Sequence, residues 1–218
     1  MNTVTATEQA LTVSASLLKK GLMELCFPLS AKQQELLLQY LVLLHKWNQV
    51  YSLTAVRDLT RMVGAHLLDS LSVVPLLSGE NVLDVGSGAG LPGIPLAVAK
   101  PDRKVTLLDS SHKKTAFLRQ AVADLALKNA DVVCDRVEFW AAPTKFGVII
   151  SRAFSDLGEF VSLSNRLLAP DGVLAAMKGI YPFEELERLP PGFRIKEVRV
   201  LQVPCLEAER HLVLIERA

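Results

Sequence analysis

The stretch Val82–Pro95, VLDVGSGAGLPGIP, constrains the fold more than any other part of the chain. An apolar run ends at Val85, and three glycines follow at alternate positions, Gly86, Gly88 and Gly90. Because glycine adopts backbone conformations that other residues avoid, a strand running into such a loop predicts a tight turn before a helix. This arrangement is typical of α/β folds that bind a nucleotide-like cofactor where the first strand ends.

The rest of the chain after residue 80 alternates between predicted strands and predicted helices. Apolar runs predict strands at 81–85, 104–109, 130–134, 146–152 and 172–178, and helical periodicity is clearest at 113–127 and 156–168. Two β-rich runs at the end, 193–203 and 210–216, predict an antiparallel hairpin. The order predicts a Rossmann-like α/β fold, with a mostly parallel sheet covered by helices on both faces.

The chain before residue 80 contains only helical patterns. Ser30 and Gln33 form a predicted capping box, and Leu37, Leu41 and Leu44 follow on one helical face. A second helix is predicted at about 60–77, and the small, polar first dozen residues predict a disordered start. We therefore expect a helical extension over 1–79 and an α/β domain over 80–218.

Composition limits the compartment and the partners. The net charge of +1 argues against strong nonspecific binding to bare nucleic acid, although a local basic patch remains compatible with it. The three cysteines are far apart, which suits a reducing cytoplasm. We find neither a signal peptide nor an apolar run long enough to span a bilayer, so a cytoplasmic protein is expected.

The register of the glycines decides between cofactor classes. A literal G-x-G-x-x-G begins at Gly88, but a dinucleotide fingerprint should begin at Gly86, where the strand ends, and its third position is then Leu91. Asp84, inside the strand, would repel a pyrophosphate and would suit a cofactor with a cationic amino-acid end. No Lys-Ser/Thr follows at P-loop spacing.

A second carboxylate supports the same interpretation. Asp109 ends the second predicted strand, where nucleotide-binding α/β folds place a carboxylate that accepts hydrogen bonds from ribose hydroxyls. Alone it would be weak, since Asp109 could simply cap the next helix. Together with Asp84 and the glycines it favours S-adenosyl-L-methionine over a nicotinamide cofactor. A glycine turn without any ligand is a further alternative, disfavoured because three glycines cost backbone entropy.

The chain resembles the bacterial methyltransferase G family, also called glucose-inhibited division protein B, from about Gln33 to its end. The resemblance is carried by the glycine loop and by seven further stretches, 45–48 (HKWN), 51–54 (YSLT), 66–70 (HLLDS), 136–138 (RVE), 150–153 (ISRA), 177–179 (MKG) and 210–212 (RHL). The glycine loop alone indicates only a methyltransferase, whereas the first and third stretches are specific to the family. Ser52, where asparagine is more usual, and the extended N-terminus depart from the pattern.

The resemblance implies a function and a set of site residues. It implies transfer of a methyl group from S-adenosyl-L-methionine to N7 of a guanine in the 530 loop of 16S rRNA (position 527 in conventional rRNA numbering), within the small ribosomal subunit or an assembly intermediate. Cofactor contacts are then expected from Gly86, Leu91, Val137, Glu138 and Arg152, with the three residues named earlier, Asp84, Gly88 and Asp109. No catalytic base is named, since guanine N7 carries a free lone pair. Arg152, which closes an apolar strand, would instead orient the reactants.

The expected partner is RNA, with no metal and no membrane, and the protein is expected to be a monomer. Candidate phosphate or base contacts are Lys46, Arg57, Arg61, His112, Lys113, Lys114, Lys178 and Arg210. His45, His66 and His211 are as compatible with structural roles as with RNA contacts. Two alternatives from other classes are a regulatory protein that keeps the fold without transferase activity and a nicotinamide-dependent oxidoreductase.

Overall fold

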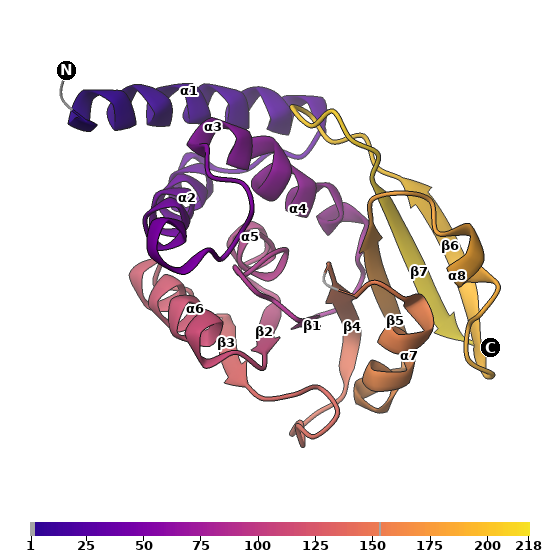
Figure 1. Ribbon diagram of the computed structural model, residues 1–218. Coiled ribbons are helices and arrows are strands. Elements are labelled where there is room, and N and C mark those ends of the chain that lie inside the picture. Colours follow the sequence, from indigo (N-terminus) through magenta and orange to yellow (C-terminus); the bar gives the residue numbers. More distant parts are fainter. Residues whose placement is uncertain (1–2, 153) are drawn as a thin grey trace.

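A seven-stranded sheet forms the centre of the protein (Figure 1), whose computed structural model describes residues 3–152 and 154–218. The strand order is β3-β2-β1-β4-β5-β7-β6; β7 pairs antiparallel with β5 and with β6, and the other neighbouring pairs are parallel. The strands are β1 (Asn81–Val85), β2 (Lys104–Asp109), β3 (Ala130–Cys134), β4 (Phe146–Ser151), β5 (Leu168–Lys178), β6 (Phe193–Val200) and β7 (His211–Arg217). The predicted parallel sheet with a terminal antiparallel hairpin is confirmed.

Helices cover both faces of this sheet. They are α1 (Thr3–Glu24), α2 (Ala31–Tyr51), α3 (Leu59–Met62), the π-helix η1 (Val63–Leu68), α4 (Asp69–Ser72), η2 (Val74–Leu76), α5 (Gly93–Ala99), α6 (His112–Asp124), α7 (Leu157–Ser164), η3 (Asn165–Leu167) and α8 (Phe183–Leu186). Successive strand side chains point to opposite faces: Val82 joins the core shared with α1 to α6, and Leu83 joins the core shared with α7. One face therefore carries most of the helices.

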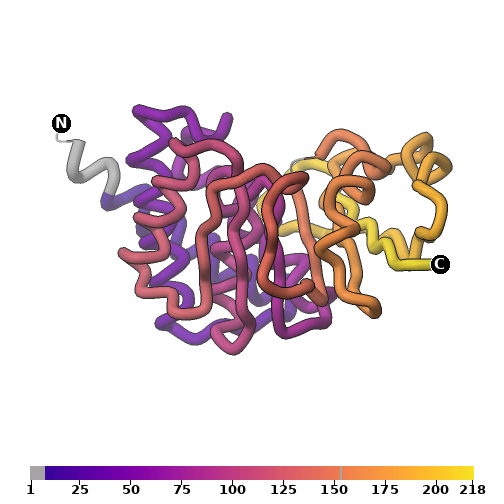
Figure 2. Tube along the Cα trace, turned by 90° about the horizontal axis from the view of Figure 1, so that it is seen from below, coloured from indigo at the N-terminus to yellow at the C-terminus, as the bar shows by residue number. Residues whose placement is uncertain are grey.

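The N-terminal helices share one core with the sheet. Leu37 and Leu41 on α2 and Leu67 on η1 lie in the same buried cluster as Ile94 on α5 and Phe117 on α6. Viewed from below, the N-terminal helices (indigo to purple) and the C-terminal strands (orange to yellow) lie toward opposite ends of the molecule (Figure 2). The division at residue 80 remains a prediction about domains, and packing joins the two parts.

Local differences from the predicted elements have physical causes. The predicted disorder of the first dozen residues is wrong from residue 3 on, where α1 begins, and residues 1–2 lie outside the described residues. The capping box of Ser30 and Gln33 is confirmed, with both reciprocal hydrogen bonds present. The helix predicted at about 60–77 is found as four successive helical segments, α3, η1, α4 and η2. Gly64, in the π-helix η1, lies so close to the chain at Cys205 that an added Cβ would be 2.3 Å from the Cys205 carbonyl oxygen.

Candidate active site

The glycine loop after β1 is tightly wound. Gly86, Gly88 and Gly90 have φ angles of 71°, 58° and 86°, in the left-handed region that favours glycine. The backbone N–H of Gly86 donates to the Leu108 carbonyl at 2.8 Å, which ties the loop to the end of β2. A Cβ at Gly90 would lie 2.5 Å from Cδ1 of Ile94, so the loop packs directly on α5. The predicted turn between strand and helix is confirmed.

Asp84 lies fully buried beneath this loop. Its Oδ2 accepts a hydrogen bond from the Gly93 N–H at 3.0 Å, at the start of α5. Its Oδ1 has no hydrogen-bond partner among the described residues. Burial raises the pKa of Asp84 to about 6, although the Gly93 N–H lowers it. A buried carboxyl group with one free oxygen is suited to receive a cation.

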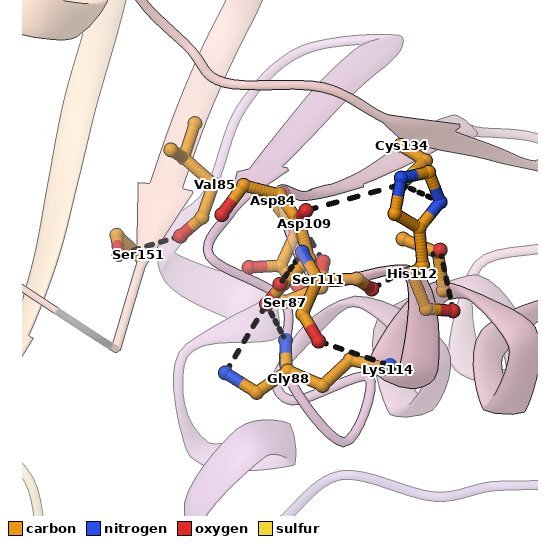
Figure 3. A network of polar contacts seen from close by, with 12 residues as sticks. Asp84, Val85, Ser87, Gly88, Asp109, Ser111, His112, Lys114, Cys134 and Ser151 are labelled. Atoms are coloured by element: carbon orange, nitrogen blue, oxygen red, sulfur yellow. Dashed lines mark hydrogen bonds and ion pairs between the residues drawn. The ribbon is translucent and has the colours of Figure 1, made fainter.

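Asp109 links the glycine loop to helix α6 (Figure 3). Its Oδ2 accepts from the Gly88 N–H and its Oδ1 from the Ser111 N–H, both at 2.9 Å, and Lys114 Nζ lies 3.6 Å from Oδ2. The helix itself is capped by Ser111, whose side chain accepts from the Lys114 N–H. Asp109 is therefore not the helix cap, and its carboxylate retains acceptor capacity beside the strand end, since an ionised carboxylate offers about four lone-pair sites.

These elements surround a cavity of about 400 Å³, here called the strand-end cavity. Four predicted site residues line it together: Gly86, Asp109, Val137 and Glu138. The remaining lining comes from Val85, Leu108, Ser110, Lys114, Asp135, Arg136, Phe154 and Leu163. Its volume is in the usual range for a small-molecule site, and its lining includes both apolar and polar residues.

The wall formed by the segment after β3 is held by contacts with η3 and β4. Arg166, in η3, donates to the carbonyls of Val137 and Trp140, the latter at 2.8 Å. Trp140 also packs against Phe146, with ring centroids 5.9 Å apart. The loop that carries Val137 and Glu138 is thereby held in place before any ligand arrives.

The other predicted site residues lie close by without lining this cavity. Leu91 is buried in the helical core, and its N–H donates to the Ser87 carbonyl. Gly88 is part of the glycine loop, where its N–H donates to Asp109, and Asp84 is buried beneath the loop, where it accepts from the Gly93 N–H. Arg152 follows β4 and lines a different cavity, whereas Phe154, two residues later, lines the strand-end cavity. Ala153 lies between them and is the last position of the predicted stretch 150–153. It is outside the described residues.

The second cavity, here called the arginine pocket, has a volume of about 320 Å³. It is lined by Asp69, Arg152, Met177, Lys178, Gly179 and Arg210. Asp69 is fully buried and pairs with both arginines, at 2.9 Å to Arg152 and 3.0 Å to Arg210. Arg152 also donates to the Ala65 carbonyl at 3.1 Å. Four chain segments that are distant in the sequence therefore meet here.

The candidate RNA contacts divide between several places. Lys178 and Arg210 line the arginine pocket, and Lys114 lines the strand-end cavity. His112 contacts the thiol of Cys134 at 3.3 Å. The remaining four candidates are exposed: Lys46 on α2, Arg57 between α2 and α3, Arg61 on α3 and Lys113 on α6. Their contacts with RNA stay a prediction.

His66 and His211 form hydrogen bonds to backbone carbonyls, whereas His45 Nε2 lies 3.2 Å from Nε2 of Gln49 on the same helix. His66 Nδ1 lies 2.8 Å from the Ala65 carbonyl and must donate to it, so Nε2, 2.9 Å from the Thr54 hydroxyl, accepts. Burial and, to a smaller extent, the positive charge of Arg152 lower the pKa of His66 to about 4. His211 Nδ1 lies 2.9 Å from the Gly179 carbonyl. His66 and His211 therefore support the walls of the arginine pocket.

The comparisons with known proteins identify the family. The family model described as rRNA small subunit methyltransferase G matches residues 33–213. The chain belongs to this family. The protein named Ribosomal RNA small subunit methyltransferase G of Laribacter hongkongensis is 57% identical over 196 residues, covering 90% of this chain and 95% of its own. The protein of the same name in Chromobacterium violaceum is 56% identical over 204 residues, covering 93% and 98%.

Solved structures agree with the fold of this methyltransferase family. A ribosomal protein L11 methylase from Lactobacillus delbrueckii superposes with a TM-score of 0.55 at 16% identity, covering 69% of this chain and 76% of that one. A SAM-dependent methyltransferase from Aquifex aeolicus superposes with a TM-score of 0.53 at 24% identity, covering 68% and 90%. At these identities the likeness shows the fold alone, and it confirms the predicted fold class.

The protein is a methyltransferase whose cofactor is S-adenosyl-L-methionine, and the nicotinamide alternative is wrong. The residues present fit this cofactor. The unpaired Oδ1 of Asp84 suits the cationic amino-acid end, and Asp109 provides acceptors at the cavity wall. An added Cβ on Gly88 would meet only the Gly86 carbonyl oxygen, at 3.7 Å, so the loop backbone is open to a ligand.

Sequence reasoning missed three kinds of residue. Phe154 and Leu163 carry no pattern that separates them from ordinary core residues. Tyr40, on α2, is fully buried and donates to the Ala89 carbonyl in the glycine loop at 2.6 Å. Asp69 stands in the family-specific stretch 66–70, but the sequence analysis gives it no role in the site.

Residues 3–152 and 154–218 contain no group of three or more His, Cys, Asp or Glu residues that could hold a metal ion. Within the same residues, no helix is long and apolar enough to cross a membrane.

Proposed function

We propose that the protein transfers a methyl group from S-adenosyl-L-methionine to N7 of a guanine in the 530 loop of 16S rRNA. Family membership over residues 33–213 is the observation that carries this proposal. The natural substrate is the small ribosomal subunit or an assembly intermediate, and the protein acts as a cytoplasmic monomer. The near-neutral charge of +1 supports recognition of a shaped RNA–protein particle rather than strong binding to free RNA.

The strand-end cavity is the proposed cofactor site. Gly86 and Gly88 present backbone to the ligand, Asp109 accepts from its ribose hydroxyls, and Val137 and Glu138 face its adenine. Leu91 supports the loop from the core side. Asp84 offers its unpaired oxygen to the cationic end of the ligand. When bound, the cofactor would supply an electrophilic methyl group attached to a sulfonium centre; transfer of this methyl group to N7 would break the sulfur–methyl bond and leave S-adenosylhomocysteine.

The proposed reaction requires alignment rather than proton removal. Guanine N7 carries a lone pair and no proton, so its attack on a methyl carbon needs no general base. The protein contributes proximity and orientation, which can lower a barrier by about 7–11 kcal/mol. His66 fits this account, because its pKa of about 4 and its two hydrogen bonds keep it a neutral structural group.

Arg152 connects the cofactor site to the proposed RNA site. It follows β4 and lies in the arginine pocket, with Phe154 of the strand-end cavity two residues further along the chain. In a regular A-form helix guanine N7 faces a groove too narrow for side chains, so the target base must lie in a loop or leave its stack. The arginine pocket is where we place the RNA segment that carries this base.

Mapping 7-methylguanine in 16S rRNA tests the proposal. Chemical cleavage at 7-methylguanine or mass spectrometry of the 530-loop fragment is compared between cells with and without the gene. We expect the modification to vanish in the deletion strain and to return with the wild-type gene. A deletion strain that retains the modification would refute the proposal.

The same experiment separates the regulatory alternative, which differs in needing no transfer. A Gly86→Val gene serves as the discriminating control, since it should lose cofactor binding. If the deletion alters growth and the Gly86→Val gene restores it without restoring methylation, a regulatory role would be favoured over transfer.

A further inference from the structure

The most deeply buried charge in the arginine pocket belongs to the N-terminal helical segment. Asp69, the first residue of α4, has no exposed surface. Placing an isolated carboxylate in a protein interior costs several kcal/mol, so such a group is retained only with charged or hydrogen-bonding partners. Its partners lie 83 and 141 positions away along the chain, in the α/β part of the molecule.

Both carboxylate oxygens of Asp69 are occupied by different arginines. Oδ2 accepts from Nη1 of Arg152 at 2.9 Å, and Oδ1 accepts from Nε of Arg210 at 3.0 Å. Arg210 Nη1 also donates to the Glu209 carbonyl at 2.8 Å, and Arg152 Nη1 to the Ala65 carbonyl. The two arginine side chains keep about a quarter of their surface exposed, 26% and 25%. Each is thus anchored on one side and open on another.

The open side faces a pocket suited to an anion. Lys178 contributes a third cation to the lining, and Gly179 contributes no side chain that would obstruct entry. Lys178 is itself held by Glu185 at 2.8 Å and by the Ser155 carbonyl at 2.8 Å. Arginine binds phosphate oxygens best when its planar guanidinium is fixed in orientation. Fixed cations around a cavity of about 320 Å³ match one phosphate group with its sugar.

We infer that Asp69 is a positioning residue, which holds Arg152 and Arg210 in the orientation that binds a phosphate group of the RNA strand beside the target base. This inference rests on the proposed function, because it takes RNA as the substrate. It assigns a residue of the helical extension to substrate binding, while the cofactor cavity is built from the α/β part alone.

A simple charge count gives the opposite expectation. Removing a carboxylate makes the pocket more positive, so arginines acting only as point charges would bind RNA more tightly without Asp69. If Asp69 positions them, its removal releases both guanidiniums and weakens binding. The sign of the effect therefore separates positioning from bulk electrostatics.

The test measures KM and kcat for methylation of small subunits isolated from cells that lack the modification. Asp69→Ala should raise KM for subunits at least tenfold. The dissociation constant of S-adenosylhomocysteine, measured by calorimetry, should change less than twofold. Asp69→Asn is nearly isosteric and keeps one acceptor oxygen, enough for one arginine, so it should show an intermediate rise in KM. Unchanged or lower KM in both variants would overturn the inference.

Two further variants exclude a general structural effect. Glu197→Gln removes a carboxylate from an exposed pair with Arg199 on β6, so it changes the net charge equally and should leave KM unchanged. In an Arg210→Ala background, Asp69→Ala should add less to KM than it does alone, because only Arg152 remains for Asp69 to position. Fully additive effects, or loss of S-adenosylhomocysteine binding by Asp69→Asn, would show that Asp69 does not act through the arginines. Absence of methylation by the wild-type protein would instead refute the proposed function.

Discussion

The strand-end cavity and the arginine pocket are built in different ways. The former takes its walls from the ends of β1 and β2 and from the segments after β3 and β4, which follow one another in a regular α/β order. The latter gathers Asp69, Arg152, Lys178 and Arg210 from four segments, one of them in the N-terminal helices. The proposed cofactor site is thus produced by the α/β fold itself. The proposed RNA pocket depends in addition on a residue of the N-terminal helices.

The two regions also differ in how charge is handled. The buried Asp84 has one oxygen without a hydrogen-bond partner among the described residues and a raised pKa, and we propose that it faces the cationic end of the cofactor. The buried Asp69 is paired with two arginines, and we propose that these arginines bind an anion. If both proposals hold, substitutions in the two regions should separate cofactor binding from RNA binding.

The largest expected effect belongs to the glycine loop. Gly86→Val should abolish S-adenosylhomocysteine binding, because φ of 71° is strained for a β-branched residue and the side chain would enter the cavity. Gly192→Val is the matched control, with φ of 84° and no atom near an added Cβ. Calorimetry should find no binding in the first variant and wild-type affinity in the second. Equal affinities would show that the cofactor lies elsewhere.

Asp84→Asn should affect stability and cofactor binding in opposite directions. Because burial raises the pKa of Asp84 from 3.8 to about 6, the stability linked to it is present below pH 3.8 and is lost as the pH rises through 6. At pH 8, without ligand, the variant should therefore be more stable, by an amount on the order of 2–3 kcal/mol. It should also bind S-adenosylhomocysteine more weakly. Thermal unfolding at pH 4 and pH 8 checks the first part, and a gain equal at both would contradict it.

Arg152→Ala should separate the two regions kinetically. Loss of charge-assisted hydrogen bonds, each worth about 1.5–3 kcal/mol, should lower kcat/KM for subunits at least tenfold. The affinity for S-adenosylhomocysteine should stay within twofold, because Arg152 does not line the strand-end cavity. A loss of cofactor affinity with normal KM for subunits would reverse the assignment of the two cavities.

Tyr40→Phe should give the smallest effect. The variant removes the buried hydroxyl that donates to the Ala89 carbonyl, at a cost of about 1 kcal/mol. Because Ala89 lies in the glycine loop, affinity for S-adenosylhomocysteine should fall two- to fivefold. Tyr51→Phe, on the exposed end of α2, is the control and should behave as wild type. Identical behaviour of both variants would show that the helical extension does not support the loop.

The contrast between the cavities explains what could be predicted from the sequence. The sequence predicts β1, β2 and β3 with the bounds found in the structure, because each is a short apolar run that ends at, or is directly followed by, a glycine or an aspartate. Gly86 and Asp109 follow from the same regularity. Asp69 could not be assigned, since its partners are 83 and 141 positions away and no local pattern encodes that distance. Phe154 and Leu163 were missed because a cavity wall and a core use the same residue types.

A crystal structure of the protein with S-adenosylhomocysteine tests the central claim most directly, namely that cofactor and RNA occupy separate cavities. We expect the ligand in the strand-end cavity, in contact with Gly86, Asp109, Val137 and Glu138. The paired Asp69, Arg152 and Arg210 should remain unchanged and untouched. A ligand lying against Arg152 and Arg210 in the arginine pocket would contradict the account.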